Sequence, residues 1–287
     1  MWRSLVFVIF INAAVFSAHA QNPQSTAPTP TPSATPSLER KFLKNILRDQ
    51  RAIWTSPLHL EKEDAKWFLP LGLSTAALIA TDRRTAGALH DHRLRLNISR
   101  DVGYLGSGYS AGAIAAAFYL IGRKEGNARA HETGLLVAEG LIDDGIVLSA
   151  LKLGTERPRP RKDEGRGRFF HGGFSFPSGH PMVAWSLATI VANEYHDRPM
   201  VRVAAYGLAT LVGVSRFTGR NHFLSDVLVG SAIGYGIGRY VYRRHPDPPP
   251  EPMSQEKPRA PSKLLPLIIP RYGRAAHNYG VALVWSF

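Results

Sequence analysis

Six long apolar segments constrain what this chain can fold into. Each is rich in Ala, Leu, Val and Gly, and each is interpreted as a helix. The segments are residues 67–81, 103–122, 134–153, 181–193, 200–214 and 223–242. Because 44% of the 287 residues are hydrophobic, the chain can bury a sizeable core in one large domain or two small ones.

The last of these segments carries small residues at a regular interval. Gly230, Gly234 and Gly238 follow Asp226 at steps of four residues, so all four positions share one face of a helix. A face of glycines lets a neighbouring helix approach closely. We therefore expect another helix to pack tightly against this face.

The sequence Pro177-Ser178-Gly179-His180 precedes the fourth apolar segment. Pro177 cannot continue a helix from its N-terminal side, whereas Ser178 suits a helix start. The free backbone N–H groups and the positive dipole end of a helix favour an anion, and Gly179 lets the backbone approach one closely. The motif predicts part of an oxyanion site with a histidine in it.

His222 and Asp226 stand one helical turn apart at the start of the sixth segment. A carboxylate that accepts the Nδ1 proton of His222 would fix the tautomer with Nε2 free and would stabilise the imidazolium. A histidine activated in this way can act as a nucleophile.

Cationic side chains lie at the end of the third segment, just after it and before His222, at Lys152, Arg159 and Arg216. Each motif taken alone has an ordinary interpretation as a surface pair, a basic turn or a loop that enters a helix. Their conjunction favours a phosphate site.

The three motifs KxxxxxxRP, PSGH and SRxxxxxHxxxD occur here in that order, across residues 134–242. The sequence therefore resembles the superfamily of type 2 phosphatidic acid phosphatases and vanadium haloperoxidases. The resemblance implies an all-α fold, a bundle of roughly six helices with the active site at one end.

The resemblance also implies a role for each motif residue. Three side chains would bind phosphate oxygens with help from the Ser178 hydroxyl and the Gly179 amide, His222 would attack phosphorus, His180 would protonate the leaving alkoxide and Asp226 would orient His222. The three phosphate-binding side chains are those of Lys152, Arg159 and Arg216. No metal ion or other cofactor is implied, and vanadate would act as an inhibitor.

The leading hypothesis is therefore an exported, metal-independent phosphatase that hydrolyses a phosphate monoester or a lipid (pyro)phosphate through a phosphohistidine. Two other functions remain open at this point. A haloperoxidase would hold vanadate as its cofactor in the same site, with His222 as the axial ligand. A non-catalytic envelope protein would use its basic surface to hold an anionic lipid or polymer, although such a role does not require His180, His222 and Asp226 together.

The net charge of +13 and the pI of about 10.2 favour anionic partners. These include a phosphorylated lipid, a small phosphoester and an anionic membrane surface, whereas predicted export argues against nucleic acid. The chain has no cysteine, so thiolate metal sites and disulfides are excluded.

The two ends of the chain differ from the apolar middle. Residues 1–20 resemble a cleaved signal peptide, with Arg3 before an apolar run and a small-x-small end at Ala18-His19-Ala20. Residues 21–37 and 246–263 are Pro-rich and predict linkers on either side of a domain at 38–245. The alternation in residues 279–287 predicts a strand, so residues 264–287 are expected to form a hairpin or extended tail on the bundle.

Residues 38–54 predict a basic amphipathic helix that Pro57 ends. Its apolar side chains recur at helical spacing, at Phe42, Leu43, Ile46, Leu47, Ile53 and Trp54. Such a helix covers a protein core or lies on an anionic lipid surface, and the pattern favours the core.

Three observations argue against a bundle that spans a membrane. The fourth and fifth segments are shorter than the ~20 residues of a bilayer span. Glu139, Asp143 and Asp144 interrupt the third segment, and charges at the bilayer centre are costly. The mean hydropathy is −0.13. These observations favour an exported, periplasmic protein that is soluble or peripheral, and a multi-pass membrane protein stays open as the alternative.

Overall fold

The computed structural model describes residues 38–59, 61–90, 92–162, 165–245, 267–273 and 278–284. The helices are α1 (Leu38–Thr55), α2 (Ala65–Gly87), α3 (Arg93–Tyr104), α4 (Gly108–Glu125), α5 (Ala128–Thr155), α6 (Gly179–Glu194), α7 (Pro199–Thr218) and α8 (Leu224–Arg244). Two short 3-10 turns, η2 (Ser56–His59) and η3 (Lys62–Asp64), connect α1 to α2. The predicted signal peptide and both predicted linkers lie outside the described residues, so these boundaries stay predictions.

The predicted all-α bundle is confirmed. Five of the six apolar segments lie within α2 and α5–α8, although Phe223 stands just before α8. The second segment is divided between α3 and α4. The first residues of this segment belong to α3, a helix that was not predicted. Helix α3 ends at the C-cap Leu105, and a new helix begins after the N-cap Ser107. The Ser107 hydroxyl caps the new helix by accepting a hydrogen bond from the Ser110 N–H at 3.1 Å.

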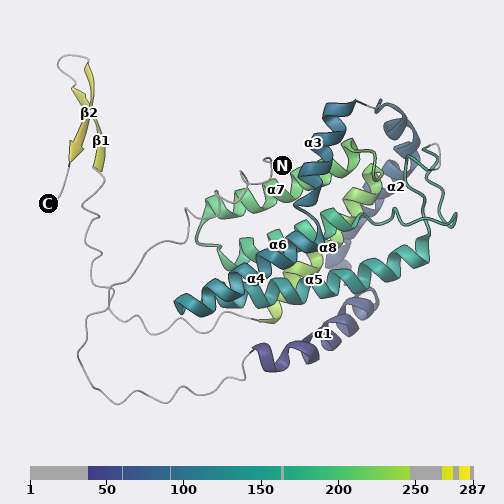
Figure 1. Ribbon diagram of the computed structural model, residues 1–287, viewed down its shortest axis with the longest axis horizontal. Coiled ribbons are helices and arrows are strands. Elements are labelled where there is room, and N and C mark those ends of the chain that lie inside the picture. The colour runs from purple at the N-terminus through teal and green to yellow at the C-terminus, as the bar shows by residue number, and fades with distance from the viewer. Residues whose placement is uncertain are drawn as a thin grey trace, which may run out of the picture.

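Helix α6 lies in the interior of the bundle and packs against α5, α7 and α8 (Figure 1). Most of its side chains are buried, which explains why its sequence is apolar on every face. Met182 and Ile190 of α6 meet Leu136 of α5 and Ile237 of α8 in the main core cluster. This arrangement fixes the start of α6 relative to its neighbours.

The glycine face of α8 packs directly on the backbone of α6, as predicted. A Cβ atom would lie 2.3 Å from the Ser178 carbonyl oxygen at Gly230 and 2.0 Å from that of Met182 at Gly234. Both distances are too short for any side chain. One turn earlier, the Ser178 N–H donates to the Asp226 carbonyl oxygen at 3.0 Å. The contact therefore sets the first turn of α8 against the start of α6.

Helix α1 lies along the outer side of α5 (Figure 1). Ile46 faces the core as expected, but Leu43 and Leu47 are 77% and 75% exposed. The side chains of Asn45 and Asp49 are buried instead, and Gln50 donates to the Asp143 carboxylate at 2.8 Å. Much of the face that α1 turns toward α5 is therefore polar, and only part of its apolar face covers the core.

Apolar side chains also point outward from the bundle. On α7, Val203, Leu208, Leu211 and Val214 are exposed. Within the described residues, two stretches are long and apolar enough to cross a membrane, Arg93–Glu125 and Pro199–Thr218. Length and composition alone make this weak support for a membrane span.

The C-terminal region contains a hairpin. Strands β1 (Leu267–Gly273) and β2 (Asn278–Val284) pair in antiparallel register, with Leu267 opposite Val284. A strand was expected in this region, and Figure 1 shows the hairpin apart from the helices, whereas we expected the tail to pack on the bundle.

Candidate active site

Four helix ends meet at one end of the bundle. The last turns of α5 and α7 supply Lys152 and Arg216, and the first turns of α6 and α8 supply His180 and Asp226. The connection from α5 to α6 supplies Arg159 and the turn from α7 to α8 supplies His222. The three motifs therefore converge although more than seventy residues separate Lys152 from Asp226.

The imidazole of His222 is buried and its Nδ1 atom lies 2.8 Å from the Ser175 carbonyl oxygen. A carbonyl oxygen only accepts hydrogen bonds, so Nδ1 carries the proton and Nε2 is left with its lone pair. Burial lowers the pKa of His222, and the charges of Arg216 and Arg159 act in the same direction against the pull of Asp226. The ring is therefore neutral at pH 7 and has the tautomer that a nucleophile needs.

Asp226 does not hold His222 in the way we expected. Its Oδ2 atom lies 3.7 Å from His222 Nδ1, which is too long for a hydrogen bond. The carboxylate instead accepts hydrogen bonds from the Ser175 hydroxyl at 2.6 Å and the Phe223 N–H at 2.9 Å. Asp226 thus binds the hydroxyl of Ser175, and the carbonyl oxygen of the same residue holds the His222 ring.

His180 lies within electrostatic range of the other motif residues, which are Arg216, His222, Lys152 and Arg159. Lys152 is half-buried and Arg159 is exposed. The buried Nε of Arg216 has no hydrogen-bond partner within the described part of the chain. Three cations that repel one another beside two histidines form a site suited to an oxyanion.

Ser178 stands at the N-cap position of α6, but its hydroxyl does not cap the helix. The hydroxyl is buried, and no partner for it exists among the residues that the structure describes. It is therefore available to a ligand. Gly179 has a packing reason as well as the predicted one, since a Cβ atom there would lie 2.6 Å from the Leu148 side chain.

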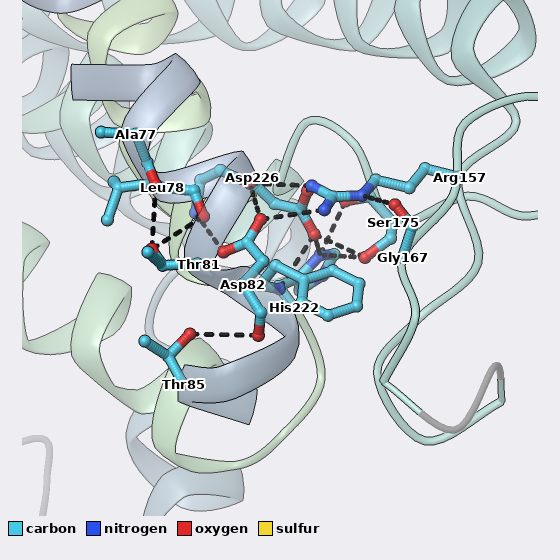
Figure 2. A network of polar contacts seen from close by, with 12 residues as sticks. Ala77, Leu78, Thr81, Asp82, Thr85, Arg157, Gly167, Ser175, His222 and Asp226 are labelled. Atoms are coloured by element: carbon cyan, nitrogen blue, oxygen red, sulfur yellow. Dashed lines mark hydrogen bonds and ion pairs between the residues drawn. The ribbon is translucent and has the colours of Figure 1, made fainter. Parts of the chain in front are cut away.

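Sequence reasoning missed the residues behind Asp226. Figure 2 shows Arg157 between the carboxylates of Asp82 and Asp226, with Ser175 beside His222. Arg157 belongs to the same Arg-Pro-Arg-Pro run as Arg159, which could have drawn attention to it, but nothing in the sequence near Asp82 indicates a site.

Residues 133–249 match the model of the PAP2 superfamily. The match confirms the resemblance that the three motifs indicated, and it includes every predicted site residue. The phosphatases of the PAP2 superfamily are independent of metal ions.

Relatives of the PAP2 region include three phosphatase-related proteins. The chain is 42% identical to lipid A 1-phosphatase of Porphyromonas gingivalis over 69 residues. The aligned residues make up 24% of this chain and 16% of that protein. It is 33% identical over 109 residues to phosphatidylglycerophosphatase B of Bacillus subtilis, covering 35% of this chain and 52% of that protein. A PA-phosphatase related-family protein of Dictyostelium discoideum is 32% identical over 84 residues, 25% of this chain and 31% of that protein. The chain thus spans at most about half the length of these relatives.

Two solved structures are similar to this chain. One is a transmembrane PAP2 type phosphatidylglycerolphosphate phosphatase from Bacillus subtilis, with a TM-score of 0.47 and 24% identity over 61% of this chain and 94% of that chain. The other is LpxE of Aquifex aeolicus, with a TM-score of 0.43 and 24% identity over 57% of this chain and 93% of that chain.

The prediction of a soluble or peripheral periplasmic protein is wrong, because relatives of the PAP2 region are integral membrane proteins. The structure explains why the sequence misled us. Glu139, Asp143 and Asp144 are buried inside the bundle, so their charges do not face outward. Helix α7 runs over 20 residues, longer than the apolar segment that predicted it, and carries exposed apolar side chains.

Proposed function

We propose that this protein is a membrane phosphatase that removes a phosphate group from a phosphorylated lipid through a phosphohistidine at His222. One observation carries the proposal. The Nδ1 proton of a buried, neutral His222 is held by a backbone carbonyl oxygen, which leaves the Nε2 lone pair free in a ring within electrostatic range of Arg216 and Arg159. The lipid substrate is supported by the names of the relatives, which act on lipid A and phosphatidylglycerophosphate.

In the first step, Nε2 of His222 attacks phosphorus and the bond from phosphorus to the ester oxygen breaks. Burial and the nearby cations lower the pKa of His180 to about 3 before substrate binds. The negative charge of the bound phosphate offsets those cations, so His180 takes up a proton with the substrate and donates it to the departing alkoxide. Lys152, Arg159 and Arg216 bind the phosphoryl oxygens and stabilise the charge that develops on them. The products of this step are the free alcohol and a phosphohistidine.

In the second step, water attacks the phosphohistidine and the bond from phosphorus to Nε2 breaks. His180, now neutral, accepts a proton from this water, and inorganic phosphate leaves. His222 returns with its lone pair on Nε2, and His180 has regained its proton. The residues that support this cycle belong to the chain itself, and no step needs a metal ion.

The test is phosphate release from phosphatidic acid by the detergent-solubilised chain, with a chelator present. We expect release by wild type and by His196→Ala, a control because His196 is an exposed histidine on the connection after α6. We expect no release by His222→Ala. Turnover by His222→Ala at the wild-type rate would refute the role of this histidine.

The same experiment separates the alternatives. A haloperoxidase would oxidise halide when vanadate and peroxide are supplied, whereas we expect vanadate to inhibit phosphate release and no halide to be oxidised. An enzyme for small soluble phosphoesters would prefer a short-chain phosphate monoester to phosphatidic acid. An anion-binding protein would release no phosphate from either substrate.

A further inference from the structure

A buried ion cluster surrounds the Asp226 carboxylate, next to His222. Arg157 is 1% exposed, and its Nη1 atom donates to the Asp226 carboxylate at 2.6 Å. Its Nη2 atom donates to the Asp82 carboxylate at 2.9 Å (Figure 2). One guanidinium is therefore shared by two carboxylates that come from α8 and α2.

The surroundings hold Arg157 in one orientation. Its Nε atom donates to the Gly167 carbonyl oxygen at 2.9 Å, and its guanidinium lies 4.7 Å and 4.3 Å from the ring centres of Phe169 and Phe223. Gly167 has a φ of 60°, and a Cβ atom there would lie 2.6 Å from the Phe223 ring. Only glycine fits at this position, so the loop is shaped to enclose the cation.

Asp82 is itself fully bonded. Besides Arg157, it accepts hydrogen bonds from the Ser225 N–H at 3.3 Å and from the Ser225 hydroxyl. Ser225 directly precedes Asp226. Asp82 therefore contacts the guanidinium that binds the Asp226 carboxylate and also the backbone next to Asp226. Asp82 lies outside residues 133–249, in a helix that the PAP2 match does not include.

The charges decide what this arrangement does. With Arg157 alone, the positive charge of the guanidinium would offset the negative charge of Asp226. With Asp82 present, two carboxylates share one cation and the cluster keeps one net negative charge beside His222. That charge stabilises the cationic imidazole that forms when Nε2 bonds to phosphorus.

We infer that Asp82 is a positioning residue for the phosphoryl-transfer reaction, acting through Arg157 to keep the Asp226 carboxylate oriented behind His222 and to leave the cluster with a net negative charge. This inference rests on the proposed phosphatase function. Asp82 touches neither the substrate nor the reacting atoms, so it affects the chemical step and leaves phosphate binding to Lys152, Arg159 and Arg216.

The test substitutes Asp82→Asn, which keeps the shape of the side chain and removes its charge. We expect kcat to fall about 10- to 100-fold. Substitution of a residue that hydrogen-bonds to a metal-ligating histidine and orients it has an effect of that size. KM for phosphatidic acid and the inhibition constant of inorganic phosphate should change less than about twofold, because the binding cations are untouched. Asp101→Asn makes the same change at an exposed carboxylate on α3 and should behave as wild type.

A double-mutant comparison separates this role from a merely structural one. In the Asp226→Asn background, Asp82→Asn should cost less than about threefold in kcat, because the carboxylate through which it acts is already neutral. Wild-type kcat for Asp82→Asn would overturn the inference. So would an equal loss in both backgrounds, or a loss matched by a lower folded fraction in a thermal melt.

The two failures can be told apart. If wild type releases phosphate and His222→Ala does not, the proposed function stands whatever Asp82→Asn does. If wild type itself releases none, the proposed function fails and the role of Asp82 fails with it.

Discussion

The contact between α8 and α6 predicts the effect of a single methyl group at Gly230. A Cβ atom at this position would lie 2.3 Å from the Ser178 carbonyl oxygen. Carbon and oxygen atoms ordinarily approach to about 3.3 Å, so one helix must move by about 1 Å in Gly230→Ala. Ser178 and Asp226 lie at this contact, so the shift reaches the site.

The expected magnitudes follow from that displacement. Overpacking of a tight contact destabilises a protein by about 1–3 kcal/mol. A misplacement of about 1 Å at a reacting centre can cost about 100-fold in rate. We therefore expect Gly230→Ala to lower kcat for phosphatidic acid about 100-fold and to lower the free energy of unfolding by about 1–3 kcal/mol.

Gly236→Ala is the matched control, because Gly236 is in the same helix and a Cβ atom there meets nothing within 4 Å. Alanine is favoured over glycine inside a helix by about 1 kcal/mol, so this variant should be slightly stabilised and fully active. Phosphate release and thermal melts in detergent measure both effects. Wild-type turnover and melting by Gly230→Ala would refute the account of how α8 is positioned.

Other predictions concern the site itself. Arg159→Ala and Arg216→Ala should each raise the inhibition constant of inorganic phosphate at least about tenfold without altering the melt, and an unchanged constant would remove that residue from the phosphate site. His180→Ala should lose far more activity on an alkyl phosphate than on nitrophenyl phosphate, whose leaving group needs no proton, whereas equal losses would indicate a structural histidine. Because burial lowers the pKa of His222, the initial burst with nitrophenyl phosphate should persist as the pH falls below ~6.5, the usual pKa of histidine, and a burst that disappears at that pH would contradict a neutral buried ring.

Much of the site could be predicted because its chemistry is local in the sequence. The spacing predicted that His222 and Asp226 meet at the start of α8 and that Ser178 stands at the start of α6, as the structure has them. It did not predict that His222 would bond to a backbone carbonyl oxygen and not to Asp226. The interval of four between the glycines of α8 likewise predicted a close helix contact, which is present. The resemblance then connected motifs that no local pattern could bring together.

The support behind the site could not be predicted in this way. The pairing of Arg157 with Asp82 depends on how α2 packs beside α8, and no spacing in the sequence encodes that packing. The hydrogen bond from His222 to a backbone carbonyl oxygen was missed for a similar reason, since any residue could supply that oxygen.

The membrane prediction was wrong because the sequence does not show which way the charges of an apolar segment face. Glu139 and Asp143 are buried, and Asp143 accepts a hydrogen bond from Gln50 of α1. The direction of a side chain on a helix depends on its neighbours, which the mean hydropathy of a chain does not contain.

The central claim is that His222 becomes phosphorylated during turnover. It is tested most directly by mixing the enzyme with phosphate-labelled substrate, quenching within milliseconds without acid, and locating the label by mass spectrometry. The account predicts label on His222 that is lost in acid, in equal amount with and without EDTA, and none in His222→Ala. Active enzyme without labelled histidine, or activity that EDTA abolishes and a divalent ion restores, would contradict it.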